Sequence, residues 1–259
     1  MPVEERSTVV HLPGGPLPYT LRHSPRARTL RVVIDPDRGV LVTVPARASR
    51  HDSERRAAEF LGQREAWVRR HLARHADLEA TLDARGGARD GGCVPFRGEL
   101  HGVRVVPAVS GVRRSDVFHL AESRELIVHR VARDRMSDAA IVERWLRSQA
   151  ADDLDTAIAR HAGPLGVTPT AVTLRDPRSR WGSASRAGRL SFSWRLVLAP
   201  PEALESVVVH ELAHLKVFGH GPRFWALVAT RMPDHRTWRR WLHDHALELH
   251  RALEPTSVR

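Results

Sequence analysis

Two histidines and a glutamate share one short segment of the sequence, His210-Glu211-Leu-Ala-His214. Residues four apart on a helix are separated by about 40° around the axis and by one turn, so both imidazoles can reach one ion. Glu211 is rotated by about 100° from His210 and would flank that ion, where a general base for an activated water belongs. The spacing predicts the His-Glu-x-x-His site of a zinc hydrolase.

A catalytic zinc site needs three protein ligands and one open position, so a third ligand must follow this segment. His220 is the leading candidate, because Gly219 lets the chain leave the helix and the turn through Gly221 and Pro222 can return the ring. The alternatives lie on the final helical segment and are His235, His243, His245, Asp234, Asp244 and Glu248.

The charged residues of the segment are surrounded by residues typical of a core, namely Val207, Val208, Val209, Leu212 and Leu215. Burying two histidines and a glutamate without partners costs free energy, and a metal ion explains their placement economically. A chance match is the alternative, since the chain contains 16 histidines.

The elements that would position this site fall into two regions. Residues 1–130 are predicted to be β-rich, with one inserted helix at 52–83 whose inner residues are Phe60, Trp67 and Leu72. Two strands around a turn at 35–39, a glycine-rich break at 83–93 and a hairpin at 120–128 are expected within this region.

Residues 131–259 are predicted to form the catalytic domain, and the fold class is α+β. The expected elements are a helix at 137–161 capped by Ser137 and stopped by Gly163-Pro164, a strand at 171–176, an alternating strand at 189–198, and a helix that begins at Pro201 and ends near Gly219. A further helix is expected after Pro222, interrupted at Met232-Pro233.

Composition narrows the classes of partner. The chain has 41 basic and 30 acidic residues, a net charge of +11, and Lys216 is its only lysine. This charge makes a nucleic-acid partner possible, but the arginines are spread along the chain without a clear basic patch. The single Cys93 excludes an intrachain disulfide. With no signal segment and no apolar run of about 18–20 residues, we expect a cytoplasmic protein that does not enter membranes.

Further motifs surround the His-Glu segment: Arg180-Trp181-Gly182-Ser183, Trp194-Arg195-Leu196, the helix start at Pro200-Pro201, and Phe224-Trp225-Ala226-Leu227. Together with His220, these residues resemble the YgjP-like metallopeptidase family and, more distantly, the SprT and WLM zincins. The resemblance covers most of the chain and is strongest at 175–242. It implies a zincin-like, mainly helical catalytic domain with a short sheet. It also implies His210, His214 and His220 as metal ligands and Glu211 as the catalytic residue.

Two positions depart from the family pattern, since Ala184 stands where cysteine is usual and Ser193 where asparagine is common. Neither departure touches the zinc ligands. The resemblance implies a peptide or protein substrate, which we expect to pair with the strand at 189–198 as an edge strand. The candidate substrate-binding residues are Arg180, Trp181, Trp194 and Arg223.

The expected chemistry uses one Zn²⁺ per chain, which lowers the pKa of a bound water towards about 7. Glu211 takes the proton and later delivers it to the leaving amine. Tyr19, the only tyrosine, is distant in sequence, so the oxyanion donor is sought among Arg180, Arg223 and His235. Two alternatives remain open: a nucleotide or phosphate-ester hydrolase, suggested by the arginines, and a DNA-associated protease like SprT.

Overall fold

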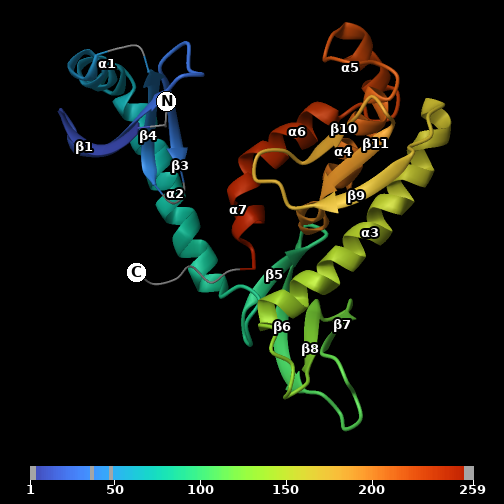
Figure 1. The fold of residues 1–259 in the computed structure, drawn as a ribbon. Helices are drawn as coiled ribbons and strands as arrows, with labels where there is room; N and C mark the ends of the chain where they lie inside the picture. The colour runs from blue at the N-terminus through green and yellow to red at the C-terminus, as the bar shows by residue number, and fades with distance from the viewer. Residues whose placement is uncertain (1–3, 36–37, 47–48, 254–259) are drawn as a thin grey trace. The chain divides into compact units, whose positions relative to one another are not determined.

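The computed structural model describes residues 4–35, 38–46 and 49–253, and the chain forms two compact units, Met1–Thr81 and Leu82–Arg259 (Figure 1). Both units combine strands with helices, and the α+β fold class is confirmed. The predicted boundary at residue 130 does not coincide with the division between the units. None of the helices in the described residues is both long and apolar enough to cross a membrane.

The first unit contains one sheet with the strand order β1-β2-β4-β3. Its strands are β1 (Glu4–Leu12), β2 (Gly15–Ser24), β3 (Arg31–Asp35) and β4 (Gly39–Pro45). β2 and β4 run parallel, whereas β3 and β4 form an antiparallel hairpin around the predicted turn. Pro36 and Asp37, at the centre of that turn, lie outside the described residues.

The predicted helix at 52–83 consists of two helices, α1 (Arg50–Gln63) and α2 (Glu65–Arg85). Their buried side chains include Ala57, Leu61 and Val68, each with no exposed surface. The prediction was wrong for Trp67, which is 37% exposed, because the helix face that meets the sheet lies one residue further along the chain. Of the other two predicted inner residues, Leu72 packs against this core, and Phe60 lies under the guanidinium of Arg64.

The second unit begins with a sheet of order β5-β6-β8-β7. Its strands are β5 (Cys93–Phe96), β6 (Glu99–Pro107), β7 (Asp116–Leu120) and β8 (Glu125–Arg130), and the antiparallel β7–β8 pair confirms the hairpin predicted near 120–128.

The long helix α3 (Asp138–Leu165) packs against this sheet and against the elements that follow it (Figure 1). Ser137 caps its first turn, where its hydroxyl accepts a hydrogen bond from the amide of Ala140. The helix runs through the predicted stop at Pro164 because a proline in the last turn breaks few helical hydrogen bonds, and Gly166 ends it in the left-handed conformation.

The turn between β5 and β6 explains why these strands belong to the second unit. The Arg97 amide donates to the Val197 carbonyl at 2.7 Å, and the Gly98 amide donates to the Leu198 carbonyl at 3.1 Å. The Arg97 guanidinium also pairs with Asp153 of α3 at 2.6 Å. The sheet is therefore fixed to the segment that directly precedes the His-Glu helix.

That segment differs from its prediction. The strand expected at 189–198 ends at Ser193 as β11 (Arg189–Ser193), and Trp194–Leu198 form the 3-10 helix η1, capped by the Ser193 hydroxyl. β11 is the central strand of a sheet of order β10-β11-β9, so it is not the expected edge strand. Its neighbours are β9 (Ala171–Arg175), which confirms the strand predicted at 171–176, and β10 (Gly182–Ala184).

Four helices complete the unit: α4 (Pro201–His214), α5 (Pro222–Ala229), α6 (His235–Asp244) and α7 (Ala246–Arg251). α4 begins at Pro201 as predicted but ends at His214, several residues before Gly219. The break predicted at Met232-Pro233 separates α5 from α6.

Replacing Gly98 with alanine should destabilise the second unit by about 1–3 kcal/mol. Gly98 has φ +82°, and an added Cβ would lie about 3.0 Å from Pro200, which precedes α4. Gly102→Ala in β6 is the matched control, because the space beside Gly102 is open. Denaturant unfolding measures both variants, and equal midpoints would contradict the importance of this close approach.

Candidate functional site

Three histidine rings converge at the end of α4. His210 Nε2 lies 3.2 Å from His214 Nε2 and 3.1 Å from His220 Nε2, and the ligand atoms of all three rings lie within 4.8 Å of one another. Two nitrogen ligands of a tetrahedral zinc ion are separated by about 3.3 Å when each bond is 2.0–2.1 Å. The donor set and its spacing therefore fit a divalent metal ion.

The chain after α4 brings His220 back to the helix. The His214 Nδ1–H donates to the Val217 carbonyl at 3.2 Å, which leaves the Nε2 lone pair of His214 directed at the other two rings. Gly219 then adopts φ +89°, as its predicted role as a bend requires. The buried Phe224 of α5 stacks on the His214 ring, with centroids 4.4 Å apart.

Burial sets the protonation of the groups in this site. The pKa of His210 is lowered to about 3, first by burial and then by the neighbouring His214 and His220 rings. Its neutral form offers the lone pair that a metal requires. Burial raises the pKa of Glu211 to about 7, and the nearby Arg180 guanidinium opposes this shift.

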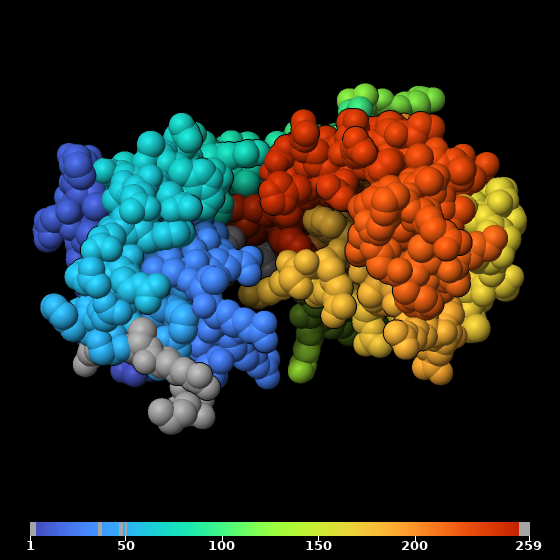
Figure 2. Space-filling view, turned by 90° about the horizontal axis from the view of Figure 1, so that it is seen from above, coloured from blue at the N-terminus to red at the C-terminus, as the bar shows by residue number. Residues whose placement is uncertain are grey.

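Glu211 lies against the edge strand β10. Only 6% of its surface is exposed, and a Cβ added at Gly182 would lie 2.7 Å from both its Cγ and its Oε1. The backbone of β10 approaches the carboxylate this closely because residue 182 has no side chain. In Figure 2 the golden atoms around β10 lie beside the orange atoms of the α4–α5 segment.

Two cavities adjoin this strand. The first, here called the apolar cavity, has a volume of about 260 Å³ and contains His210 and Glu211 in its wall. Its other lining residues are Arg180, Trp181, Gly182, Ser206, Val207, Trp225, Val228, His235, Arg239 and Leu242. The second, here called the cationic cavity, has a volume of about 390 Å³ and is lined by Arg175, Asp176, Pro177, Arg180, Gly182, Ser183 and Ser191.

The four candidate substrate-binding residues do not share one location. Arg180 and Trp181 line the apolar cavity. Arg223 is exposed on α5 and lines neither cavity.

Trp194 is fully buried, and the guanidinium groups of Arg147 and Arg195 lie 5.2 and 4.6 Å from its ring centre. Its ring stabilises the core and is not accessible to a substrate, so that candidate role was wrong.

The alternative third ligands also separate from the histidine cluster. His235 lines the apolar cavity, but its Nδ1–H donates to the Met232 carbonyl at 3.0 Å and the ring stacks on Trp225. Among the described residues, the cluster contains only His210, His214 and His220. None of His235, His243, His245, Asp234, Asp244 and Glu248 belongs to it.

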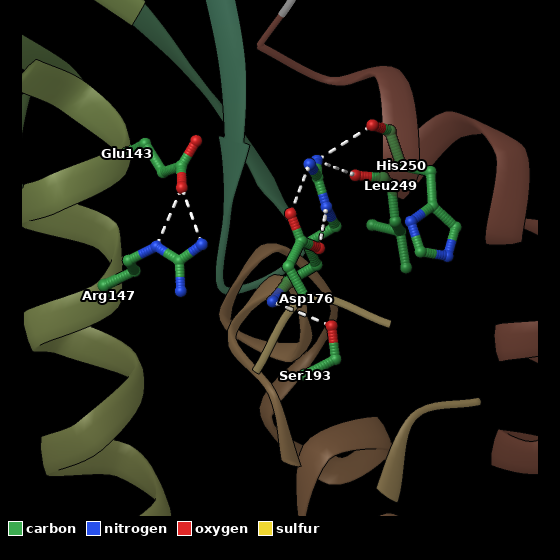
Figure 3. A network of polar contacts seen from close by, with 7 residues as sticks. Glu143, Arg147, Asp176, Ser193, Leu249 and His250 are labelled. Atoms are coloured by element: carbon green, nitrogen blue, oxygen red, sulfur yellow. Dashed lines mark hydrogen bonds and ion pairs between the residues drawn. The ribbon is translucent and has the colours of Figure 1, made fainter. Parts of the chain in front are cut away.

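A largely buried arginine, Arg195, fixes the start of the loop that carries Arg180 and Trp181, and Figure 3 shows the contacts at Asp176, Leu249 and His250. Arg195 donates two hydrogen bonds to the Asp176 carboxylate, at 2.8 and 3.1 Å, and further bonds to the carbonyls of Leu249 and His250. Trp181 stacks on the His250 ring with centroids 5.2 Å apart. The loop is therefore held near both ends.

Sequence reasoning did not identify several cavity residues, notably Val228, Arg239 and Leu242. No pattern within one segment shows that α5 and α6 face the same cavity. Gly182 was noted only as part of a motif, although its lack of a side chain is the signal that another group approaches it.

Three converging imidazoles, a buried glutamate beside them and an adjacent edge strand are the features of a metallopeptidase domain. The family model described as YgjP-like, metallopeptidase domain, matches residues 28–245, and the chain belongs to this family. Membership identifies a hydrolase domain that uses a divalent metal ion.

No curated protein matches the chain. Among solved structures, the crystal structure of the metallopeptidase zymogen of Pyrococcus abyssi abylysin is 22% identical, with 37% of this chain and 93% of that chain covered and a TM-score of 0.31.

Replacing Gly182 with alanine should lower peptidase activity strongly while leaving the fold intact. The added methyl group would displace the Glu211 carboxylate, whose Cγ and Oε1 would be 2.7 Å away. Gly163→Ala in α3 is the control, because the space beside Gly163 is open. Steady-state kinetics and thermal unfolding measure the two effects, and full activity of the Gly182 variant would contradict the close approach.

Proposed function

We propose that the chain is a zinc-dependent peptidase that hydrolyses peptide bonds, with Glu211 as the general base. The observation that carries the proposal is the convergence of the three histidine nitrogens, 3.1 and 3.2 Å apart, beside a buried carboxylate. His210, His214 and His220 would hold the ion. Imidazole nitrogen suits zinc, and three protein ligands leave a fourth position open.

Zinc would supply Lewis-acid chemistry, polarising a carbonyl and acidifying water. A carboxylate oxygen of Glu211 accepts a proton from the attacking water and then donates it to the nitrogen of the leaving amine. Burial of Glu211 supports this role, since a carboxylate with a raised pKa holds a proton more readily than a solvated one.

The open edge of β10 supports a peptide substrate. The Ser193 amide donates to the Trp181 carbonyl and the Ser185 amide donates to the Arg189 carbonyl, so residues 181, 183 and 185 direct their backbone groups towards β11. The amide and carbonyl groups of Gly182 and Ala184 therefore point away from the sheet. An extended peptide that pairs with them would lie beside Glu211.

Arg180 is the best placed of the three candidate oxyanion donors. Arg223 lines neither cavity, and the Nδ1–H of His235 already donates to the Met232 carbonyl. Arg180 lines the apolar cavity together with Glu211 and interacts electrostatically with it. Its guanidinium has donors to spare for negative charge that develops on a substrate oxygen.

A phosphate-ester hydrolase is the second candidate, favoured by the two arginines of the cationic cavity. The same residues would activate water in either reaction. A panel of nucleotides and capped peptides separates the two, since the peptidase cleaves only the peptides.

Replacing Glu211 with glutamine should lower the rate of peptide hydrolysis by about 10²–10⁴-fold, while metal binding is retained. Glutamine keeps the size of the side chain but cannot accept the proton. Activity is measured on peptides with the zinc-loaded proteins, and metal content is measured by elemental analysis. Undiminished activity in a metal-loaded Glu211→Gln protein would exclude the proposed role.

Replacing His220 with alanine should weaken zinc binding, because only two nitrogen ligands remain. His243→Ala is the matched control, since His243 is exposed on α6 and lies outside the cluster. Competition with a fluorescent zinc chelator measures both affinities. Equal zinc affinities for the two variants would show that the ion binds elsewhere.

A further inference from the structure

We propose that the cationic cavity binds a carboxylate group of the substrate, so that the peptidase prefers a peptide with an acidic group next to an apolar side chain. This inference rests on the proposed function and adds a substrate preference to it. The carboxylate has two sources, an aspartate or glutamate side chain or the C-terminus of the peptide, and the experiment below distinguishes them.

The two cavities lie on opposite faces of the three-stranded sheet. Leu190 and Phe192 of β11 are buried in the core, and Ala184 and Gly182 are their partners in β10. Ser191 points to the other face, as does its partner Ser183. Arg175 of β9 belongs to that second face as well, because its register partner in β11 is Ser193, two residues after Ser191.

The charge of the cationic cavity is not neutralised from within. Its one acidic residue, Asp176, is bound through both carboxylate oxygens by Arg195. Arg175 forms no ion pair with any residue that the structure describes, and Arg180 lines both cavities. Two guanidinium groups and the hydroxyls of Ser183 and Ser191 thus line a space whose only carboxylate is already bound by Arg195, and this is the donor set that carboxylates prefer.

The cavity is also preformed. Asp176 is fixed by Arg195, which in turn is bound to the carbonyls of Leu249 and His250 (Figure 3). Trp181, next to Arg180, is stacked on His250. Because these contacts hold the loop in place, a ligand would lose little free energy in ordering it.

The period of an extended chain connects the two cavities. Successive side chains of a peptide paired with Gly182 and Ala184 point to opposite faces of the sheet. A side chain on the core face enters the apolar cavity beside His210 and Glu211, and its neighbour enters the cationic cavity. A carboxylate should therefore raise the rate of cleavage when its residue lies an odd number of positions along the peptide from the apolar residue that enters the apolar cavity. It should have no such effect when the separation is an even number of positions.

The test uses zinc-loaded protein and capped peptides with one leucine among alanines. A single glutamate is moved one residue at a time, with glutamine at the same position as the reference. We expect glutamate at the odd positions to raise kcat/KM about tenfold, the size of a charge-assisted hydrogen bond. In a second series, glutamine replaces glutamate and the C-terminus is left free. If kcat/KM rises only in this series, the carboxylate that binds is the α-carboxylate of the peptide.

Arg175→Glu is the decisive variant. Arg175 lines only the cationic cavity, so its reversal should remove the preference for glutamate and create one for lysine at the same positions. Arg178→Glu is the matched control, because Arg178 is exposed in the same loop and lines neither cavity. It should keep the wild-type preference.

The outcomes separate this inference from the proposed function. Cleavage of glutamate and glutamine peptides at equal rates would overturn the carboxylate site and leave the peptidase intact. Binding of labelled peptides to Glu211→Gln protein, measured by fluorescence anisotropy, provides a readout without turnover. If no peptide is cleaved but glutamate peptides bind through Arg175, the site stands and the peptidase proposal fails. Inorganic phosphate and unlabelled glutamate peptide are also compared as competitors of the labelled peptide. If phosphate competes more strongly, and its effect depends on Arg175, the assignment of the cavity to carboxylates is overturned.

Discussion

The side chain of Glu211 packs directly against the backbone of Gly182, in the space where any other residue would carry its Cβ atom. The arrangement of the site depends on this contact. An added Cβ at residue 182 would lie 2.7 Å from Glu211 Oε1, so with any other residue at this position the Glu211 carboxylate would have to move away from β10. The contact brings an open strand edge to a buried carboxylate. It also lets the apolar and cationic cavities adjoin the same strand, since Arg180 and Gly182 line both.

The rest of the second unit holds α4 and β10 in this relation. The β5–β6 turn is hydrogen-bonded to η1 just before α4, and Arg97 joins the same turn to α3. Arg195 connects the loop after β9 to the carbonyls of Leu249 and His250. Both sets of contacts involve charged or backbone groups that are satisfied inside the protein, and such groups fix geometry more specifically than apolar packing does.

Local patterns were sufficient for the metal-binding segment and insufficient for its surroundings. The spacing of His210, Glu211 and His214 follows from helix geometry, and Gly219 signals the bend that precedes His220, so the cluster was predictable within one segment. The expected edge strand at 189–198 was wrong because alternating apolar residues fit a central strand followed by a buried 3-10 helix equally well. Trp194 was misassigned because its ring is buried in a core built from elements that are remote in sequence. The residues of the cationic cavity come from three strands, whose register no single segment encodes.

The placement of polar residues on the small sheet now has a physical explanation. A sheet that served only to cover the core would need apolar residues on its inner face, and polar residues of any kind would suffice on its outer face. Here the outer face carries two serines opposite each other and an arginine without an ionic partner among the described residues, whereas the only nearby carboxylate is bound by Arg195. An unpaired guanidinium beside a loop that is already ordered retains its full capacity to bind an anion. The same strand that presents free backbone groups to a peptide therefore also separates two chemically different environments, and the two-residue period of that peptide is sufficient to direct neighbouring side chains into each of them.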